Sequence, residues 1–202
     1  MINNMKTQKD NISNGVKNKK IIAIIGMAGS GKSATVNYLQ QKYGWPKIYL
    51  GQTTFDRLKK EGLTLNYTNE KIIREKIRRE LGMDAYAKLA LPGVAKLLKT
   101  AKIVLIESLY SWGEYKIFKK KYRENFLAIA ITTPSKIRLK RLKTRLIRPI
   151  KTAAELTKRD FTEIEGTDKG GPIAVADYTI INDGSKEKLE KNIDLIIKEV
   201  NK

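Results

Sequence analysis

The sequence predicts an α/β protein in which a five-stranded parallel sheet is covered by helices on both faces. Short apolar runs, typical of strands that are buried on both faces, alternate along the chain with segments of helical periodicity. Strands that are separated by helices pair in parallel, because each crossover returns the chain to the same end of the sheet. A chain of 202 residues suits one such domain. The predicted strands are residues 20–25, 47–50, 102–107, 126–131 and 178–181.

Helices are predicted between and after these strands. One of them should turn Ile72, Ile73 and Ile77 inward, and Pro92 should kink or break the next one. Ser185 is expected to cap the last helix. The predicted helices are residues 31–43, 54–60, 69–81, 84–98, 113–122, 134 to about 145, 153–164 and 185 to about 200.

The composition excludes several kinds of site. The chain has no cysteine and no histidine, so disulfides, thiolate metal sites and histidine acid–base chemistry are excluded. No apolar run approaches the roughly 20 residues that a membrane helix needs. We therefore expect a cytoplasmic protein without a membrane partner. Residues 1–19, rich in Asn and Lys, are expected to form a disordered basic arm before a single domain over residues 20–202.

A glycine-rich motif follows the first predicted strand and precedes the first predicted helix. Residues 26–33, Gly-Met-Ala-Gly-Ser-Gly-Lys-Ser, match G-x-x-x-x-G-K-[ST]. The glycines let the backbone N–H groups approach phosphate oxygens, and the helix adds its positive N-terminal end. We expect Lys32 to reach the β- and γ-phosphates of ATP and Ser33 to ligate Mg²⁺. The predicted ATP-binding residues of this P-loop are Gly26, Ala28, Gly29, Ser30, Gly31, Lys32, Ser33 and Ala34.

An acidic residue, Glu107, ends the third predicted strand. A carboxylate beside the P-loop strand would hold Mg²⁺ through water or contact the acceptor of a phosphoryl group. The alternative is a polar residue that merely ends a strand. We favour the functional interpretation and predict Glu107 as a catalytic and metal-binding residue.

A basic segment runs from residue 125 to residue 154 without one acidic residue, in a chain of net charge +20. Arg141 and Arg145 are one helical turn apart, and Arg148 follows them before Pro149. Phosphoryl transfer needs cations around the moving group, and the planar guanidinium suits phosphate oxygens. We therefore predict a short lid at about residues 146–152 and catalytic roles for Arg145 and Arg148. The alternative is a solvated helix face.

Several motifs resemble one group of enzymes. Beside the P-loop they are the Arg141–Arg145 pair, residues 176–185 (Ala-Asp-Tyr-Thr-Ile-Ile-Asn-Asp-Gly-Ser), residues 78–85 (Arg-Arg-Glu-Leu-Gly-Met-Asp-Ala) and the Arg159-Asp160 pair. Over about residues 21–198 the chain resembles the dephospho-CoA kinase and nucleoside monophosphate kinase group of P-loop kinases. Within that group it is most similar to dephospho-CoA-kinase-like nucleotide kinases of prokaryotes.

The resemblance implies a three-layer α/β/α fold with strand order 2-3-1-4-5, an acceptor-binding helical region at about residues 51–98 and an Arg-bearing lid. It implies that Arg141 lies over the adenine, that Arg145 lies near the phosphates, and that Asn182 and Gly184 frame the base. Arg78 would bind the acceptor. True dephospho-CoA kinases carry an Asp just after the second strand, where this chain has Gly51-Gln52, so we predict Gln52 rather than an Asp at the acceptor.

Three functions remain open at this point. The first is an ATP-dependent kinase that acts on a small anionic acceptor, either a nucleoside monophosphate or a dephospho-CoA-like molecule. The second is a P-loop NTPase or ATP-binding regulatory protein without small-molecule kinase activity, which would need a water-positioning residue that we do not find. The third is a basic nucleic-acid-binding protein. We rank it last because no aromatic residue lies between residues 128 and 154.

Overall fold

The strands form a parallel sheet. Because they all run in the same direction, the loops that follow them lie together at one edge of the sheet, its carboxyl edge. The computed structural model describes residues 19–146 and 148–201. Within these residues the sheet has five strands in the order β2-β3-β1-β4-β5, and each neighbouring pair is parallel. The predicted fold class and the strand order that the resemblance implied are therefore confirmed. The strands are β1 (Lys20–Ile25), β2 (Lys47–Tyr49), β3 (Ile103–Glu107), β4 (Phe126–Thr132) and β5 (Tyr178–Ile181).

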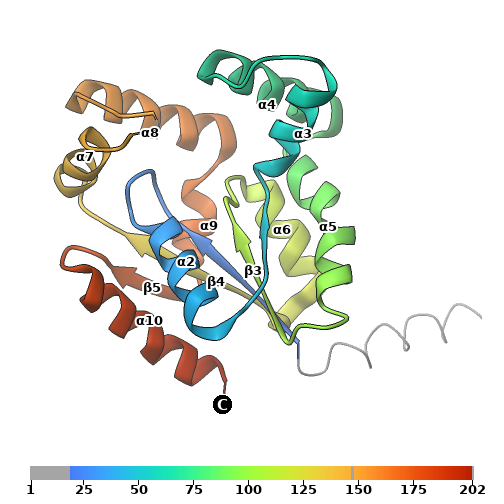
Figure 1. The fold of residues 1–202 in the computed structure, drawn as a ribbon, viewed down its shortest axis with the longest axis vertical. Coiled ribbons are helices and arrows are strands. Elements are labelled where there is room, and N and C mark those ends of the chain that lie inside the picture. The colour runs from blue at the N-terminus through green and yellow to red at the C-terminus, as the bar shows by residue number, and fades with distance from the viewer. Residues whose placement is uncertain (1–18, 147, 202) are drawn as a thin grey trace, which may run out of the picture.

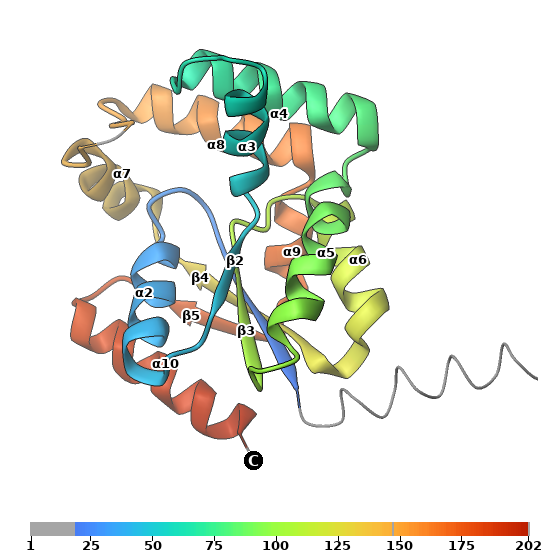
Figure 2. The ribbon, with the colours of Figure 1, turned by 45° about the vertical axis from the view of Figure 1, so that its right-hand side comes forward.

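Helices cover both faces of the sheet and its carboxyl edge (Figures 1 and 2). In both views α2 and α10 lie on one face, α5 and α6 lie on the other, and α4 and α8 lie beyond the ends of the strands. No helix of the described residues is both long and apolar enough to span a bilayer. The helices are α2 (Lys32–Tyr43), α3 (Gln52–Lys60), α4 (Tyr67–Leu81), α5 (Ala85–Leu97), α6 (Trp112–Tyr122), the 3₁₀ turn η1 (Arg123–Asn125), α7 (Ser135–Lys143), α8 (Ala153–Thr167), α9 (Gly170–Ala174) and α10 (Lys186–Val200).

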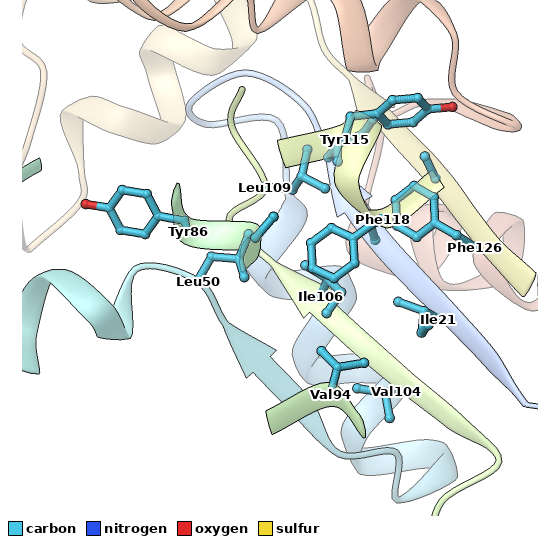
Figure 3. Packing of buried hydrophobic residues seen from close by; sticks show 14 of the residues in the cluster. Ile21, Leu50, Tyr86, Val94, Val104, Ile106, Leu109, Tyr115, Phe118 and Phe126 are labelled. Carbon is cyan, nitrogen blue, oxygen red and sulfur yellow. The ribbon is translucent and has the colours of Figure 1, made fainter. Parts of the chain in front are cut away.

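The core has two halves because successive side chains of a strand point to opposite faces. Ile21, Ala23 and Ile25 of β1 belong to the cluster under α3, α4, α5 and α6, whereas Ile22 and Ile24 belong to the cluster under α2 and α10. Figure 3 shows the first half, in which side chains of α5 and α6 reach β3 and β4. These five residues of β1 are at most 1% exposed, as expected for a central strand of a three-layer fold.

The structure corrects several local expectations. Ile73 and Ile77 are buried as predicted, but Ile72 is 51% exposed. The two buried isoleucines lie one turn apart and suffice to pack α4 against the core, which leaves Ile72 on the outer side of the helix. Pro92 was expected to kink or break its helix, and the break is wrong, since α5 continues through it. Helix α7 ends at Lys143, so Arg145 lies beyond the helix and does not share a helical face with Arg141.

Two further differences concern the ends of elements. The short helix α9 was not predicted, because its sequence Gly-Gly-Pro-Ile-Ala has poor helix propensity. Of the basic arm predicted at residues 1–19, all but Lys19 lies outside the described residues. Lys19 itself donates from its ammonium group to the carbonyl oxygen of Leu98, so it belongs to the folded domain.

The orientation of α4 yields a matched pair of variants. Ile73→Ala should lower the free energy of unfolding by about 2–5 kcal/mol, because it removes buried methyl groups and leaves a cavity. Ile72→Ala should change it by less than about 1 kcal/mol, because this side chain is half exposed. Urea denaturation of both variants measures the difference, and equal losses would contradict the orientation of the helix.

Candidate active site

The P-loop joins β1 to α2 at the carboxyl edge of the sheet, under α8 (Figures 1 and 2). Its glycines adopt conformations that other residues avoid: φ is 141° at Gly26, 78° at Gly29 and 110° at Gly31. Close neighbours exclude a side chain as well. A Cβ on Gly26 would lie 2.3 Å from the carbonyl oxygen of Ile131, and one on Gly31 would lie 2.4 Å from Nδ2 of Asn182. The motif therefore forms a tight backbone cradle, as its sequence predicts.

Donors from the neighbouring strand ends hold this cradle in place. Nδ2 of Asn182, which follows β5, donates to the carbonyl oxygen of Ser30 over 2.7 Å. Oγ1 of Thr133, which follows β4, donates to the same oxygen over 3.1 Å. Both donors come from parallel strands that end at the same edge, so the fold itself fixes the backbone of the loop. The predicted ATP-binding residue Asn182 thus contacts the loop directly.

A buried arginine ties the loop to two helices. Arg138 of α7 donates to the carbonyl oxygen of Ala28 over 3.2 Å and to Oδ2 of Asp160 over 2.6 Å. Arg138 is only 6% exposed, so this arginine of the basic segment has a structural role and does not belong to a solvated helix face. Because Asp160 belongs to α8, this ion pair holds α8 over the mouth of the P-loop.

Lys32 lies across the loop in a strongly cationic environment. Its ammonium group donates to the carbonyl oxygen of Met27 over 2.9 Å. Burial lowers the pKa of Lys32 to about 7, and the nearby cations Lys169, Arg159 and Arg145 act in the same direction, while Glu163 opposes them. An anion bound at the loop would relieve this repulsion, so the site favours a phosphate chain.

Ser33 and Glu107 come together as the sequence predicts. Oγ of Ser33 donates to Oε1 of Glu107 over 2.9 Å, and Nζ of Lys47 donates to Oε2 over 2.8 Å. Glu107 is 7% exposed, at the end of the strand that pairs with β1. A hydroxyl and a carboxylate are hard oxygen donors, and Mg²⁺ commonly takes one or two such ligands besides water and phosphate oxygens. The pair therefore fits Mg²⁺, which would neutralise charge on the β- and γ-phosphates when bound.

Arg141 lies with two of its predicted neighbours. Its Nη2 donates to Oδ1 of Asn182 and to the carbonyl oxygen of Gly184, both over 3.4 Å. The structure thus brings Arg141, Asn182 and Gly184 together beside the P-loop. Arg145, by contrast, is exposed after the end of α7, and it influences Lys32 through its charge.

The predicted lid is anchored on the P-loop. The backbone N–H of Ile150 donates to the carbonyl oxygen of Leu142 over 3.2 Å. This hydrogen bond joins the two ends of the loop between Leu142 and Ile150. Leu142, Ile150 and Leu156 pack with Ala28 of the P-loop in a small apolar cluster. Residue 147 lies outside the described residues, so the lid at about residues 146–152 is described except at that position.

Arg148 is placed differently from the expectation that it faces the transferring phosphate. It forms an ion pair with Oε1 of Glu70 on α4, whose other oxygen accepts from Arg74 over 3.2 Å. The side chain of Glu70 is only 4% exposed. The lid is therefore joined to the predicted acceptor region through a buried carboxylate that the sequence analysis missed.

The two predicted acceptor residues lie on the β2 side of the sheet. Gln52 begins α3 and donates to Oδ1 of Asp56 over 3.0 Å. Arg78 has its guanidinium 5.3 Å from the ring centroid of Tyr86 and 3.8 Å from Oε1 of Glu114. Its Nε is buried and finds no hydrogen-bond partner among the described residues.

Glu114 is a buried carboxylate with a structural task. It accepts from the backbone N–H of Tyr110 over 2.7 Å and of Ser111 over 3.1 Å, and so caps α6. Burial raises the pKa of Glu114, although these hydrogen bonds and Arg78 oppose the shift. The pattern Ser111-x-x-Glu114 is a capping box that the sequence shows. Lys47 and Lys169, in contrast, carry no sequence signal that distinguishes them from other lysines.

Known proteins are similar to this chain in sequence. A family model described as an AAA domain matches residues 22–163. A UPF0200 protein of Thermococcus kodakarensis is 35% identical over 182 residues, which are 89% of this chain and 97% of that protein. The chain belongs to the UPF0200 family. The part of the resemblance that concerns P-loop kinases is confirmed, whereas these relatives are not named as dephospho-CoA kinases.

Solved structures agree on the fold. Shikimate kinase from Acinetobacter baumannii, in complex with shikimate, has a TM-score of 0.59 at 19% identity, and covers 93% of this chain and 97% of its own. A gluconokinase from Sinorhizobium meliloti has a TM-score of 0.52 at 14% identity, and covers 86% of this chain and 89% of its own. The chain therefore has the fold of P-loop kinases that act on small molecules.

The lowered pKa of Lys32 has a measurable consequence. Above about pH 8 much of the free protein should carry a neutral Lys32, and binding of MgATP should return the proton, because the phosphates favour the ammonium form. Below about pH 6 the group is already charged and contributes no uptake. Titration calorimetry in buffers of different ionisation enthalpy counts the protons taken up. The exposed-lysine variant Lys198→Met should behave like the wild type, and uptake that does not depend on pH would contradict the environment described for Lys32.

Proposed function

We propose that this UPF0200 protein is an ATP-dependent phosphotransferase that moves the γ-phosphoryl group of ATP to a small, anionic, nucleotide-like acceptor. The acceptor would be a nucleoside monophosphate or a dephospho-CoA-like molecule. The observation that carries the proposal is the contact of Ser33 with Glu107 beside Lys32, at the mouth of a preformed P-loop. Helices α4 and α8 lie beyond this edge of the sheet (Figures 1 and 2).

On the donor side each predicted residue has a role that its position supports. The backbone of residues 26–34 would surround the β-phosphate, and Lys32 would bridge the β- and γ-phosphates. Ser33 and Glu107 would hold Mg²⁺, and Lys47 would keep the carboxylate in place. Arg141, beside Asn182 and Gly184, would stack on the adenine, because a planar guanidinium pairs well with an aromatic ring.

On the acceptor side the region between α3 and α5 supplies polar and aromatic groups. Gln52 and Arg78 would bind the acceptor, and the guanidinium of Arg78 would supply the positive charge for an anionic one. The lid would close over ATP and exclude water, so that the acceptor rather than water is attacked. The ion pair of Arg148 with Glu70 supports this role of the lid, since it joins the lid to the acceptor region.

A panel assay tests the proposal. The protein is incubated with MgATP and, in turn, nucleoside monophosphates, deoxynucleoside monophosphates and dephospho-CoA, while ADP and phosphorylated product are measured together. We expect one acceptor class to yield product in equal amount to ADP. Lys32→Ala should abolish this transfer and Lys198→Ala should not. Release of ADP with inorganic phosphate alone, whatever the acceptor, would favour an NTPase instead.

Glu107 gives the sharpest test of the metal site. Glu107→Gln keeps the size of the side chain but removes its charge, so turnover should fall by at least about 10²-fold, a value typical of the loss of one well-placed catalytic group. The dependence of the rate on Mg²⁺ concentration should shift upward. Glu124→Gln, at an exposed site, serves as the control. Unchanged turnover and Mg²⁺ dependence would reduce Glu107 to a residue that ends a strand.

Variants of Arg145, just before the lid, and of Arg148, within it, distinguish a kinase from a nucleic-acid-binding protein. Arg145→Ala should lower turnover more than it weakens ATP binding, since a contact to the moving charge strengthens in the transition state. Arg148→Ala should do the same by a different route, because it frees the lid from Glu70. The same proteins are titrated with DNA and RNA at several salt concentrations, with Lys143→Ala as an exposed control. Normal turnover with a large, salt-dependent loss of nucleic-acid affinity would contradict the lid and support nucleic-acid binding instead.

A further inference from the structure

One edge of the sheet is open. The strand β5 stands last in the strand order, so only β4 pairs with it among the residues that the structure describes. Backbone groups of a strand alternate between its two sides, and the N–H of Asn182, just after β5, donates inward to the carbonyl oxygen of Thr132. The N–H groups of Thr179 and Ile181 therefore point outward, away from β4. Such an edge can pair with a further strand.

The opposite edge of the sheet is better protected. The edge strand β2 follows Pro46 and begins with Lys47, and proline and lysine both discourage the pairing of an edge strand. The strand β5 has the sequence Tyr-Thr-Ile-Ile, which contains neither a charged residue nor a proline. The sequence therefore guards one edge against association and leaves the other free for it.

The helix α10 extends the open edge with apolar surface. Leu195 of α10 is 61% exposed and Ile181 of β5 is 62% exposed. The two side chains line one open groove of about 520 Å³ between β5 and α10, which lie side by side (Figure 1). One stripe of α10 runs along this groove, and its members, at helical spacing, are Lys188, Asn192, Leu195 and Glu199.

The two ends of this stripe carry opposite charges. Where β5 ends, Nζ of Lys188 pairs with Oδ1 of Asp183 over 3.0 Å, and the lysine side chain remains 59% exposed, which leaves room for a second carboxylate. Where β5 begins, the hydroxyl of Tyr178 donates to Glu199. The helix thus runs antiparallel to β5, from a cation to a carboxylate. A second copy related by a two-fold axis would place its own Glu199 beside Lys188 at each end.

The α10 side does not share the positive charge of the chain. The helix is neutral within a chain of net charge +20, because its four lysines are balanced by four acidic residues: Lys186, Lys188, Lys191 and Lys198 against Glu187, Glu190, Asp194 and Glu199. Repulsion between two copies is therefore weakest on this side, and at an ionic strength of about 0.1 M charges more than about 10 Å apart are largely screened. A nucleic acid would find no excess of cations here. The surface fits a partner with the same charge pattern.

We infer that the protein forms a homodimer in which the β5 strands of two copies pair antiparallel and their α10 stripes lie against each other. The two sheets then join into one, and the open edge of each copy is removed. Thr179 and Ile181 gain main-chain hydrogen bonds, and Leu195 is covered. The inference goes beyond the proposed function and does not depend on it, because it uses the outer edge of the sheet and not the P-loop.

Sedimentation velocity over a series of protein concentrations tests the dimer. The wild type should approach twice the mass of one chain as the concentration rises. Leu195→Glu should remain monomeric over the same range, because it places a carboxylate from each copy in the covered groove. Leu89→Glu changes a half-exposed leucine of α5 and should dimerise like the wild type.

The mass measurements have two contrary outcomes. A wild type that stays monomeric would leave the groove to another occupant, either residues 1–18 of the chain or a different protein, and would overturn the inference. A dimer that Leu195→Glu does not weaken would place the contact elsewhere and overturn it as well. Thermal unfolding of each variant, expected to be cooperative as in the wild type, separates lost association from lost folding.

A charge swap tests the antiparallel arrangement. Lys188→Glu and Glu199→Lys should each raise the dissociation constant of the dimer roughly tenfold, since each turns two attractions across the two-fold axis into repulsions. The double variant K188E/E199K should recover most of the affinity, because opposite charges again meet at both ends. A double variant that associates no better than the single ones would overturn this arrangement.

Hydrogen exchange locates the contact on the strand. The amides of Thr179 and Ile181 should exchange more slowly as the wild type dimerises, and they should not do so in Leu195→Glu. Amides of β2, at the other edge, should exchange at a rate that does not depend on concentration. A dimer that leaves exchange in β5 unchanged would overturn the pairing of the strands.

Discussion

The hydrogen bond from Asn182 to the carbonyl oxygen of Ser30 is the contact on which the candidate site depends most. It joins the end of β5, the last strand, to the turn after β1, the first one. Because Nδ2 of Asn182 occupies the space beside Gly31, no side chain fits there, and the backbone of the loop stays close to its support. The sequence of the P-loop and that of a segment some 150 residues later are thus coupled by one donor. Arg141 adds a second link, since it donates to the other end of the same amide group.

Charge is the second constraint. A net charge of +20 does not spread evenly, because the helices beyond the carboxyl edge bring arginines and lysines toward the P-loop. Single carboxylates separate them: Glu70 between Arg148 and Arg74, and Glu163 between Lys169 and Arg159. Each arrangement avoids like-charge contact, yet leaves the cluster positive. Such an environment binds a polyanion well and would gain stability when one is bound.

Sequence patterns were sufficient for features that depend on neighbouring residues. The alternation of apolar runs and helices, the P-loop, and the place of Glu107 at a strand end all follow from local periodicity and spacing. Sequence patterns failed for features that depend on tertiary packing. Ile72 and Ile73 are equally apolar, and only the packing of α4 exposes one of them. The basic residues 136–151 look alike in sequence, yet Arg138 is buried on Asp160, Arg148 is paired with Glu70, and Arg145 is exposed.

The central claim is that a backbone cradle fixed by Asn182 binds the phosphates of ATP, and Gly31 tests it most directly. The measurement is the affinity for MgATP of Gly31→Ala beside that of Gly44→Ala, by calorimetry. Both glycines have positive φ, but a Cβ would strike Asn182 only at Gly31 and meets nothing within 4 Å at Gly44. The account requires that Gly31→Ala loses measurable ATP binding while it keeps a cooperative thermal transition, and that Gly44→Ala binds like the wild type. Wild-type affinity in Gly31→Ala would contradict it.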